Sequence, residues 1–157
     1  MLFSMTNKQK LLDFFSKQKL AVISTSNSKN PTPESALIAF TEDENLCLYF
    51  QTGKHTRKAQ NLKVNPHVSI VIGLTLEDLK TAQYEGVATR LTGEMKLKEC
   101  KEMFHQKNSP TTEEYFNHPS AIFFEVTPTW IGFSDYSGKK PKVTEIKSFR
   151  NNQELGV

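Results

Sequence analysis

Three apolar segments in the first third of the chain are separated by turns that are too short to hold a helix. The segments are residues 20–25, 34–40 and 46–52. The turns between them are rich in Asn, Ser, Pro, Asp and Glu, which favour tight reversals of the chain. Parallel strands need a crossover of a dozen or more residues, whereas antiparallel strands do not. The pattern therefore predicts an antiparallel meander here and excludes a βαβ unit.

The rest of the chain adds strands and few helices. Further strands are predicted at residues 68–74, 83–91, 121–128 and 129–136, with a Thr-Pro corner between the last two. Short helices are predicted at 6–19, from Thr56 to just before Pro66, and at 95–106. Six or seven strands favour a mainly β (α+β) fold, a small antiparallel barrel, because a closed sheet leaves no exposed edges. We expect one domain over residues 1–157, with its core at about 6–136 and a basic tail at 137–157.

Composition narrows the possible function classes. Charged residues make up 24% and hydrophobic residues 37% of the chain, and no apolar run approaches the ~20 residues of a membrane span. The first residues lack the long apolar core of a secretory signal, and Cys47 and Cys100 form no CxxC pair. We therefore expect a cytoplasmic protein with reduced thiols and no membrane partner. The net charge of +3 permits an anionic ligand without requiring nucleic acid.

Cations gather at the predicted start of the second helix. Lys54, His55, Arg57 and Lys58 occupy positions where a helix normally prefers acidic side chains, because the backbone dipole leaves partial positive charge there. Free backbone N–H groups, the hydroxyl of Thr56 and two cations together form a suitable binding site for a phosphate. A local rule broken in this way is typical of a functional site.

The competing interpretation is an ordinary solvated helix face, since clusters of Lys and Arg are common on protein surfaces. Three features favour the phosphate interpretation. Uncompensated cations at a helix start cost ~0.3–1 kcal/mol each. The cluster directly follows a strand, and Thr52 adds a second hydroxyl beside it. The glycine spacings of a P-loop and of GxGxxG are absent, so ATP and dinucleotide sites of those kinds are disfavoured.

No metal site or catalytic triad is predicted from residue spacing. The four histidines show neither HxxxH nor HExxH spacing, and no Ser-His-Asp or Cys-His arrangement can be assigned. His55 is compatible with a phosphate neighbour and with an exposed loop residue. Trp130 lies in a predicted strand, where a core position and a ring-stacking role are both open. The catalytic residues therefore stay unassigned.

The segment FQTGKHTRKAQNLKVNPHVSIVIG resembles the flavin-binding core of the pyridoxamine 5′-phosphate oxidase-like, FMN-binding split-barrel family. That family has a strand ending in an aromatic residue and Thr, then Ser/Thr-Arg-Lys, then Asn-Leu and Asn-Pro-x-Val before the next strand. The resemblance extends to PESALIAF, YEGVATRLTGE and PTWIGFSDYS, and so covers most of residues 20–136. It implies an antiparallel split barrel that forms a homodimer, with one FMN per subunit near the subunit interface.

The resemblance also implies site residues. The implied cofactor-binding residues are Ala36, Leu37, Gln51, Thr52, Thr56, Arg57, Lys58, Gln83 and Trp130. Of these, Arg57 and Lys58 match the family's phosphate-binding pair, and PESALIAF matches the strand that lines the isoalloxazine. Gln83 lies near the family's flavin-contacting Gln. Trp130 lies where a residue of the second subunit covers the ring.

Departures from the family pattern bear on activity. Pyridoxamine phosphate oxidases carry a lysine at the end of the second strand, where this chain has Ala39-Phe40, and an Arg-x-His pair near the end, where SGKKPKVTEIKSFRNNQELGV has no histidine. These departures speak against pyridoxamine phosphate oxidation and leave FMN binding untouched.

Three functions follow as hypotheses. The first is an FMN-dependent oxidoreductase that exchanges hydride or electrons with a small molecule or a nicotinamide. The second is a flavin-binding or ligand-sensing protein without turnover, and a deazaflavin or haem in place of FMN stays open. Nucleic-acid binding by a small barrel is disfavoured, because the cations gather at one helix start and do not line a strand face.

Overall fold

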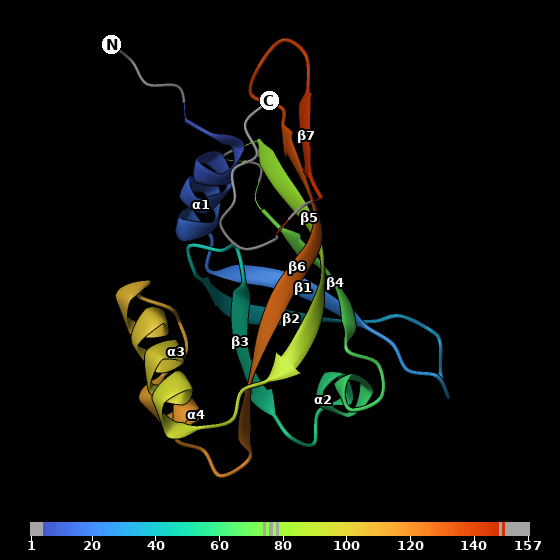
Figure 1. Cartoon of the computed structure of the whole chain (residues 1–157), viewed down its shortest axis with the longest axis vertical. Coiled ribbons are helices and arrows are strands. Elements are labelled where there is room, and N and C mark those ends of the chain that lie inside the picture. Colours follow the sequence, from blue (N-terminus) through green and yellow to red (C-terminus); the bar gives the residue numbers. More distant parts are fainter. Residues whose placement is uncertain (1–4, 74, 76, 78, 148, 150–157) are drawn as a thin grey trace.

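The computed structural model describes residues 5–73, 75, 77, 79–147 and 149. Its strands form one antiparallel sheet in the order β3-β2-β1-β4-β5-β6-β7 (Figure 1). The strands are β1 (Leu20–Thr25), β2 (Glu34–Glu42), β3 (Leu48–Gly53), β4 (His67–Ile72), β5 (Lys80–Arg90), β6 (Ala121–Asp135) and β7 (Lys142–Ile146). Because β3 also pairs with β6, the first six strands close into a barrel and β7 extends the sheet outside it. The predicted antiparallel barrel is confirmed.

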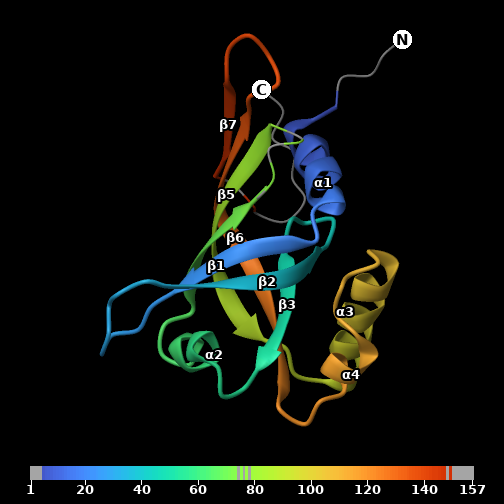
Figure 2. The same ribbon diagram turned by 180° about the vertical axis from the view of Figure 1, so that it is seen from behind.

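Short helices surround the barrel. They are α1 (Asn7–Lys17), α2 (Arg57–Leu62), α3 (Glu94–Gln106) and α4 (Glu113–Phe116). Both views place α1 and α2 at opposite ends of the barrel, and α3 with α4 along one side (Figure 2). Thr6 begins α1 with a capping box that involves Gln9, as its position before the apolar residues predicts. None of the helices within the described part of the chain is long and apolar enough to cross a membrane.

The two strands predicted on either side of the Thr-Pro corner are one strand, β6, and this prediction was wrong. Proline cannot donate a ladder hydrogen bond, so it normally interrupts a strand. Here the register between β5 and β6 shifts between Glu85 and Gly86, which pair with Trp130 and Pro128. This irregularity leaves Thr129 between two paired residues, so that the strand passes Pro128 without ending.

Part of the predicted basic tail is also a strand. Residues Lys142–Ile146 form β7, which pairs with β6 from Ile131 to Asp135. The short helix α4 was likewise not predicted. Residues 148 and 150–157 of the predicted tail lie outside the described residues.

Two apolar clusters hold the fold together. The larger one fills the barrel and extends to α1, with Phe15, Phe40, Phe50, Ile70 and Tyr84 among its fully buried side chains. The smaller cluster, Leu91, Cys100, Phe104, Phe116 and Phe123, lies between the barrel and the helices α3 and α4. This second cluster fixes α3 and α4 beside the end of β3, and thereby sets the position of the residues between them.

Candidate functional site

The loop between β3 and α2 is held by two threonine hydroxyls. Thr56 is the N-cap of α2, and its Oγ1 accepts a hydrogen bond from Ala59 N at 3.4 Å and donates one to Gly53 O at 2.9 Å. Its proton is therefore used, so the 3.1 Å contact between the hydroxyls of Thr52 and Thr56 is donated by Thr52. Both predicted site residues thus shape the loop that presents the cations.

Arg57 and Lys58 point to different surroundings. The Arg57 side chain is 79% exposed and pairs with the carboxylate of Glu34 on β2. Lys58 is half-buried, and its burial lowers the pKa of its ammonium group. Among the described residues no carboxylate pairs with Lys58. A half-buried cation without a counter-ion is a natural ligand for an anion.

Lys58 lines a cavity of about 230 Å³ between the barrel, α2 and the segment that connects α3 with α4. The other lining residues are Leu37, Ile38, Ala39, Gln51, Pro110, Thr111 and Tyr115. Three residues predicted from the sequence, Leu37, Gln51 and Lys58, therefore meet in one cavity. Pro110, Thr111 and Tyr115 were missed, because they come from a segment about 60 residues further along the chain and carry no local signal of this role.

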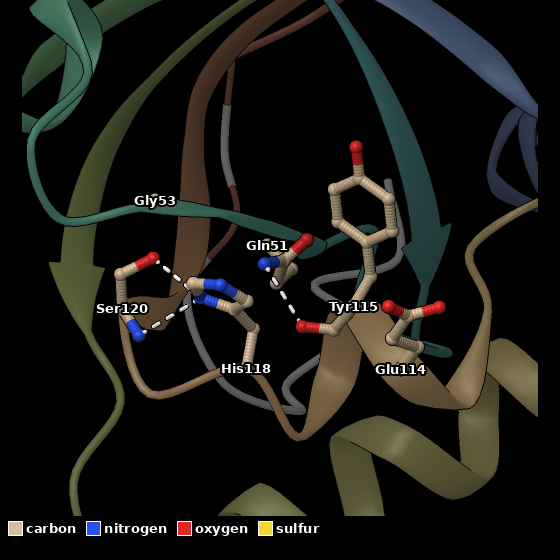
Figure 3. Close-up of a pocket in the computed structure, with 6 residues that line it drawn as sticks. All are labelled: Gln51, Gly53, Glu114, Tyr115, His118 and Ser120. Atoms are coloured by element: carbon tan, nitrogen blue, oxygen red, sulfur yellow. Dashed lines mark hydrogen bonds between the residues drawn. The ribbon is translucent and has the colours of Figure 1, made fainter.

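Figure 3 shows the residues that line a second cavity of about 320 Å³. Gln51 and Tyr115 line both this cavity and the first one. Gln51 donates from Nε2 to the main-chain carbonyl of Tyr115 at 3.4 Å. On the other side, His118 Nδ1 accepts from Ser120 N at 3.1 Å and contacts Ser120 Oγ at 2.7 Å. Because a backbone N–H can only donate, the neutral His118 ring carries its proton on Nε2. Glu114 and Gly53 complete the lining.

A buried network docks α2 onto the barrel. Asn61 is only 3% exposed, and its Nδ2 donates to Glu34 at 2.8 Å and to Thr25 Oγ1 at 3.1 Å. The carboxylate of Glu34 accepts from both Arg57 and Asn61, and these contacts hold its pKa below the usual range. Glu34 and Asn61 were not predicted as site residues. The Asn-Leu pair of the family pattern, which this chain matches at Asn61 and Leu62, is the sequence signal that could have found Asn61.

The remaining predicted residues lie on β2, β5 and β6. Ala36 packs against the core and lines neither of the two cavities described above. Gln83 is exposed on β5 and pairs with Gly132 of β6, and the indole of Trp130 lies directly over Gly132. Pairings through Val22 on β1 and Val71 on β4 connect Leu37 with Gln83 across the sheet. The group at α2 (Leu37, Gln51 and Lys58) and the group around Gln83 (Gln83 and Trp130) therefore lie on the same outer face of the sheet. Leu37 and Gln83 are three strand spacings, or ~14 Å, apart.

The cysteines offer no nucleophile at neutral pH. Cys47 and Cys100 are buried, and burial raises the pKa of each thiol to about 12. Both therefore remain protonated and unreactive. No group of three or more His, Cys, Asp or Glu side chains placed to hold a metal ion is found among the described residues.

Comparison with known proteins decides the family. Residues 8–135 match the family model described as pyridoxamine 5′-phosphate oxidase. The chain belongs to the pyridoxamine 5′-phosphate oxidase family. The cavity residues Leu37, Gln51, Lys58 and Tyr115 all fall within the matched segment of this family.

Individual members and structural neighbours vary in their described roles. General stress protein 26 of Bacillus subtilis (strain 168) is 28% identical over 142 residues, which cover 88% of this chain and 96% of that protein. The fold also resembles a putative pyridoxamine 5′-phosphate oxidase from Listeria innocua, with a TM-score of 0.64 and 18% identity over 88% of this chain and 98% of that one. A heme binding protein from Mycobacterium smegmatis gives a TM-score of 0.74 at 12% identity over 91% of this chain, which spans only 59% of that protein. At these identities the structural similarities show the fold alone.

Proposed function

We propose that this member of the pyridoxamine 5′-phosphate oxidase family binds FMN and acts as an oxidoreductase on a small molecule or a nicotinamide. The observation that carries the proposal is the half-buried cation of Lys58, which has no carboxylate partner among the described residues and lines a cavity with Leu37 and Gln51. This cavity combines a positive group with an apolar wall. A flavin mononucleotide, with its phosphate and its flat ring system, requires both.

Two cations would hold the phosphate. Lys58 faces the cavity, and Arg57 precedes it on the first turn of α2. Since α2 has only six residues, the cations contribute more than the helix dipole does. Two charge-assisted contacts of ~1.5–3 kcal/mol each give roughly 3–6 kcal/mol, or about two to four decades of affinity. Leu37 and Ala39, which alternate along β2 with the buried Ile38, would supply the apolar wall for the ring.

The bound flavin would supply the hydride or electron transfer, and the protein would supply position and protection from water. Hydride or electron transfer of this kind needs no general acid or base from the protein. Gln51 lies where the two cavities meet, with its side chain held against the main chain of Tyr115. The second cavity therefore offers space for a small substrate beside the cofactor.

A homodimer would complete the site. Leu37, Val71 and Leu20 are 59%, 41% and 39% exposed, and all three lie on the outer face of neighbouring strands. An exposed apolar sheet face of this kind suits a second copy of the chain. A two-fold axis between the group at α2 and the group around Gln83 would bring Gln83 and Trp130 of one copy over Leu37 of the other. This arrangement unites the two groups of predicted residues that one copy keeps apart.

Titration of the apoprotein with FMN tests the proposal. We expect FMN fluorescence to be quenched with a dissociation constant in the micromolar range or below, and riboflavin to bind at least ten times more weakly because it lacks the phosphate. Anaerobic addition of NADH or NADPH then separates an oxidoreductase, whose bound flavin is reduced, from a flavin-binding protein without turnover. Equal affinity for FMN and riboflavin would contradict the phosphate assignment.

Val71→Glu is expected to convert the dimer into monomers and to weaken FMN binding by at least tenfold. The substitution places a charge in the middle of the exposed apolar face, where burial without a partner is costly. Molecular mass by light scattering and FMN titration measure the two effects. Val64→Glu, at a 59% exposed position between α2 and β4, is the matched control and should change neither. A monomeric wild-type chain that binds FMN tightly would refute the composite site.

Haem is the second candidate ligand, favoured by the similarity to a heme binding protein. His118 borders the second cavity, and its Nε2 could ligate an iron if the ring proton moved from Nε2 to Nδ1, which would break the hydrogen bond that Nδ1 accepts from Ser120 N. A haem absorption band that depends on His118, with no FMN binding, would select this alternative.

A further inference from the structure

The contact between Glu34 and Arg57 is fixed on one side only. The Glu34 side chain is 14% exposed, and each of its oxygens has a partner: Oε1 accepts from Arg57 Nη2 and Oε2 from Asn61 Nδ2. Asn61 is in turn buried and bonded to Thr25 on β1. The Arg57 side chain, in contrast, is 79% exposed. Glu34 is therefore the anchored partner, and Arg57 is the group whose position depends on the contact.

An exposed arginine at the start of a helix samples many rotamers, and a ligand that binds it must restrict them. Arg57 uses Nη2 toward Glu34, and its other guanidinium donors have no partner among the residues that the structure describes, so they stay available. Holding the guanidinium in advance reduces the ordering that binding requires. The carboxylate also repels a phosphate, but the guanidinium that it holds carries the opposite charge and offsets this repulsion.

We infer that Glu34 is a positioning residue, which holds Arg57 ready to bind the phosphate of the cofactor. The inference rests on the proposed function, because it assigns Arg57 to the phosphate of FMN. It adds that an acidic residue increases the affinity of this site for an anion. If Glu34 instead only competed with the phosphate for Arg57, its removal would have the opposite effect.

The test is a double-mutant cycle of Glu34 and Arg57, with FMN and riboflavin as the two ligands. We expect Glu34→Ala to weaken FMN binding about three- to tenfold and to leave riboflavin binding unchanged, because riboflavin has no phosphate. In the Arg57→Ala background, Glu34→Ala should have no further effect on FMN. Glu34→Gln keeps one acceptor oxygen, which can serve Arg57 or Asn61 but not both, and should recover part of the affinity. Glu44→Ala, an exposed acidic position between β2 and β3, is the charge-matched control.

Every result of this test either supports or overturns the role of Glu34 as a positioning residue. Unchanged or tighter FMN binding by Glu34→Ala overturns the inference. If Glu34→Ala lowers FMN affinity equally in the wild-type and Arg57→Ala backgrounds, Glu34 has a structural role and the inference is overturned. The same holds if Glu34→Ala lowers the affinities for FMN and riboflavin equally. Should Glu34→Ala fail to fold, the same cycle with Glu34→Gln decides by the same criteria. If the wild-type chain binds neither FMN nor riboflavin, the proposed function itself is wrong, and so is the inference that rests on it.

Discussion

Replacement of Lys58 by methionine is expected to weaken FMN binding by about 10- to 100-fold while the fold stays intact. One charge-assisted contact to a phosphate contributes ~1.5–3 kcal/mol, and every 1.4 kcal/mol corresponds to a factor of about ten in affinity. Burial lowers the pKa of Lys58, so at neutral pH its charge is held at a cost to the folded state. The variant should therefore be at least as stable as the wild type in the absence of ligand. FMN titration and thermal unfolding measure the two effects.

Lys54→Met is the control for this prediction. Lys54 lies in the same basic segment and is exposed, and it lines neither of the two cavities described for the candidate site. The Lys54→Met substitution also removes one positive charge. It should change FMN affinity by less than about threefold, because exposed charges are screened by salt. Equal losses in the two variants would mean that the segment acts through diffuse charge alone. Unchanged affinity in Lys58→Met would place the phosphate elsewhere.

Lys107→Met is expected to destabilise the folded protein by about 3–5 kcal/mol at neutral pH. Lys107 pairs with Glu42, and the two side chains are only 6% and 11% exposed. The ammonium group of Lys107 also lies 3.8 Å from the ring centroid of Phe40. Removal of the cation leaves the carboxylate of Glu42 buried without a partner, which is the costly way to break such a pair. Urea denaturation at pH 7 measures the loss of unfolding free energy.

The pH dependence of that loss follows from Glu42. Burial raises the pKa of the Glu42 carboxyl above its ordinary value of 4.5, even with Lys107 present. A group with a raised pKa stabilises the fold below its unfolded value, and this contribution is lost as the pH rises through the folded value. The Lys107→Met variant should therefore regain stability as the pH falls from 7 toward 4.5. A loss that does not depend on pH would contradict the role of the buried carboxylate.

Two further variants test whether the loss of stability comes from breaking the buried pair of Lys107 and Glu42. Lys98→Met removes a 79% exposed cation from α3 and should change stability by no more than about 0.5 kcal/mol. Lys107→Met combined with Glu42→Leu removes both charges and should recover most of the lost stability. Because Lys107 ends α3 just before Pro110 and Thr111, the pair also holds one wall of the cavity against β2. The single variant is thus expected to weaken FMN binding as well.

The barrel and the basic helix start could be predicted because their signals are local. Short polar turns and alternating apolar residues predict antiparallel strands wherever they occur, and the structure has β1 to β5 close to the predicted positions. The second helix begins at Thr56 as predicted, and Thr56 is its N-cap, since a cap depends only on the next few residues. The continuity of β6 through Pro128 was not predictable in this way, because it depends on a register shift against β5.

The amino-acid sequence by itself determined the fold class, the family and the position of the cations on α2, since each depends on periodicity or on a motif of neighbouring residues. Only the tertiary structure decided which cation faces a cavity: Lys58 is half-buried and has no carboxylate partner in the described part of the chain, whereas Arg57 is exposed beside Glu34. It also brought Tyr115 of α4 to the same cavity and Asn61 under Glu34. The physical reason is that burial and pairing arise from contacts between distant segments, which local sequence patterns do not specify.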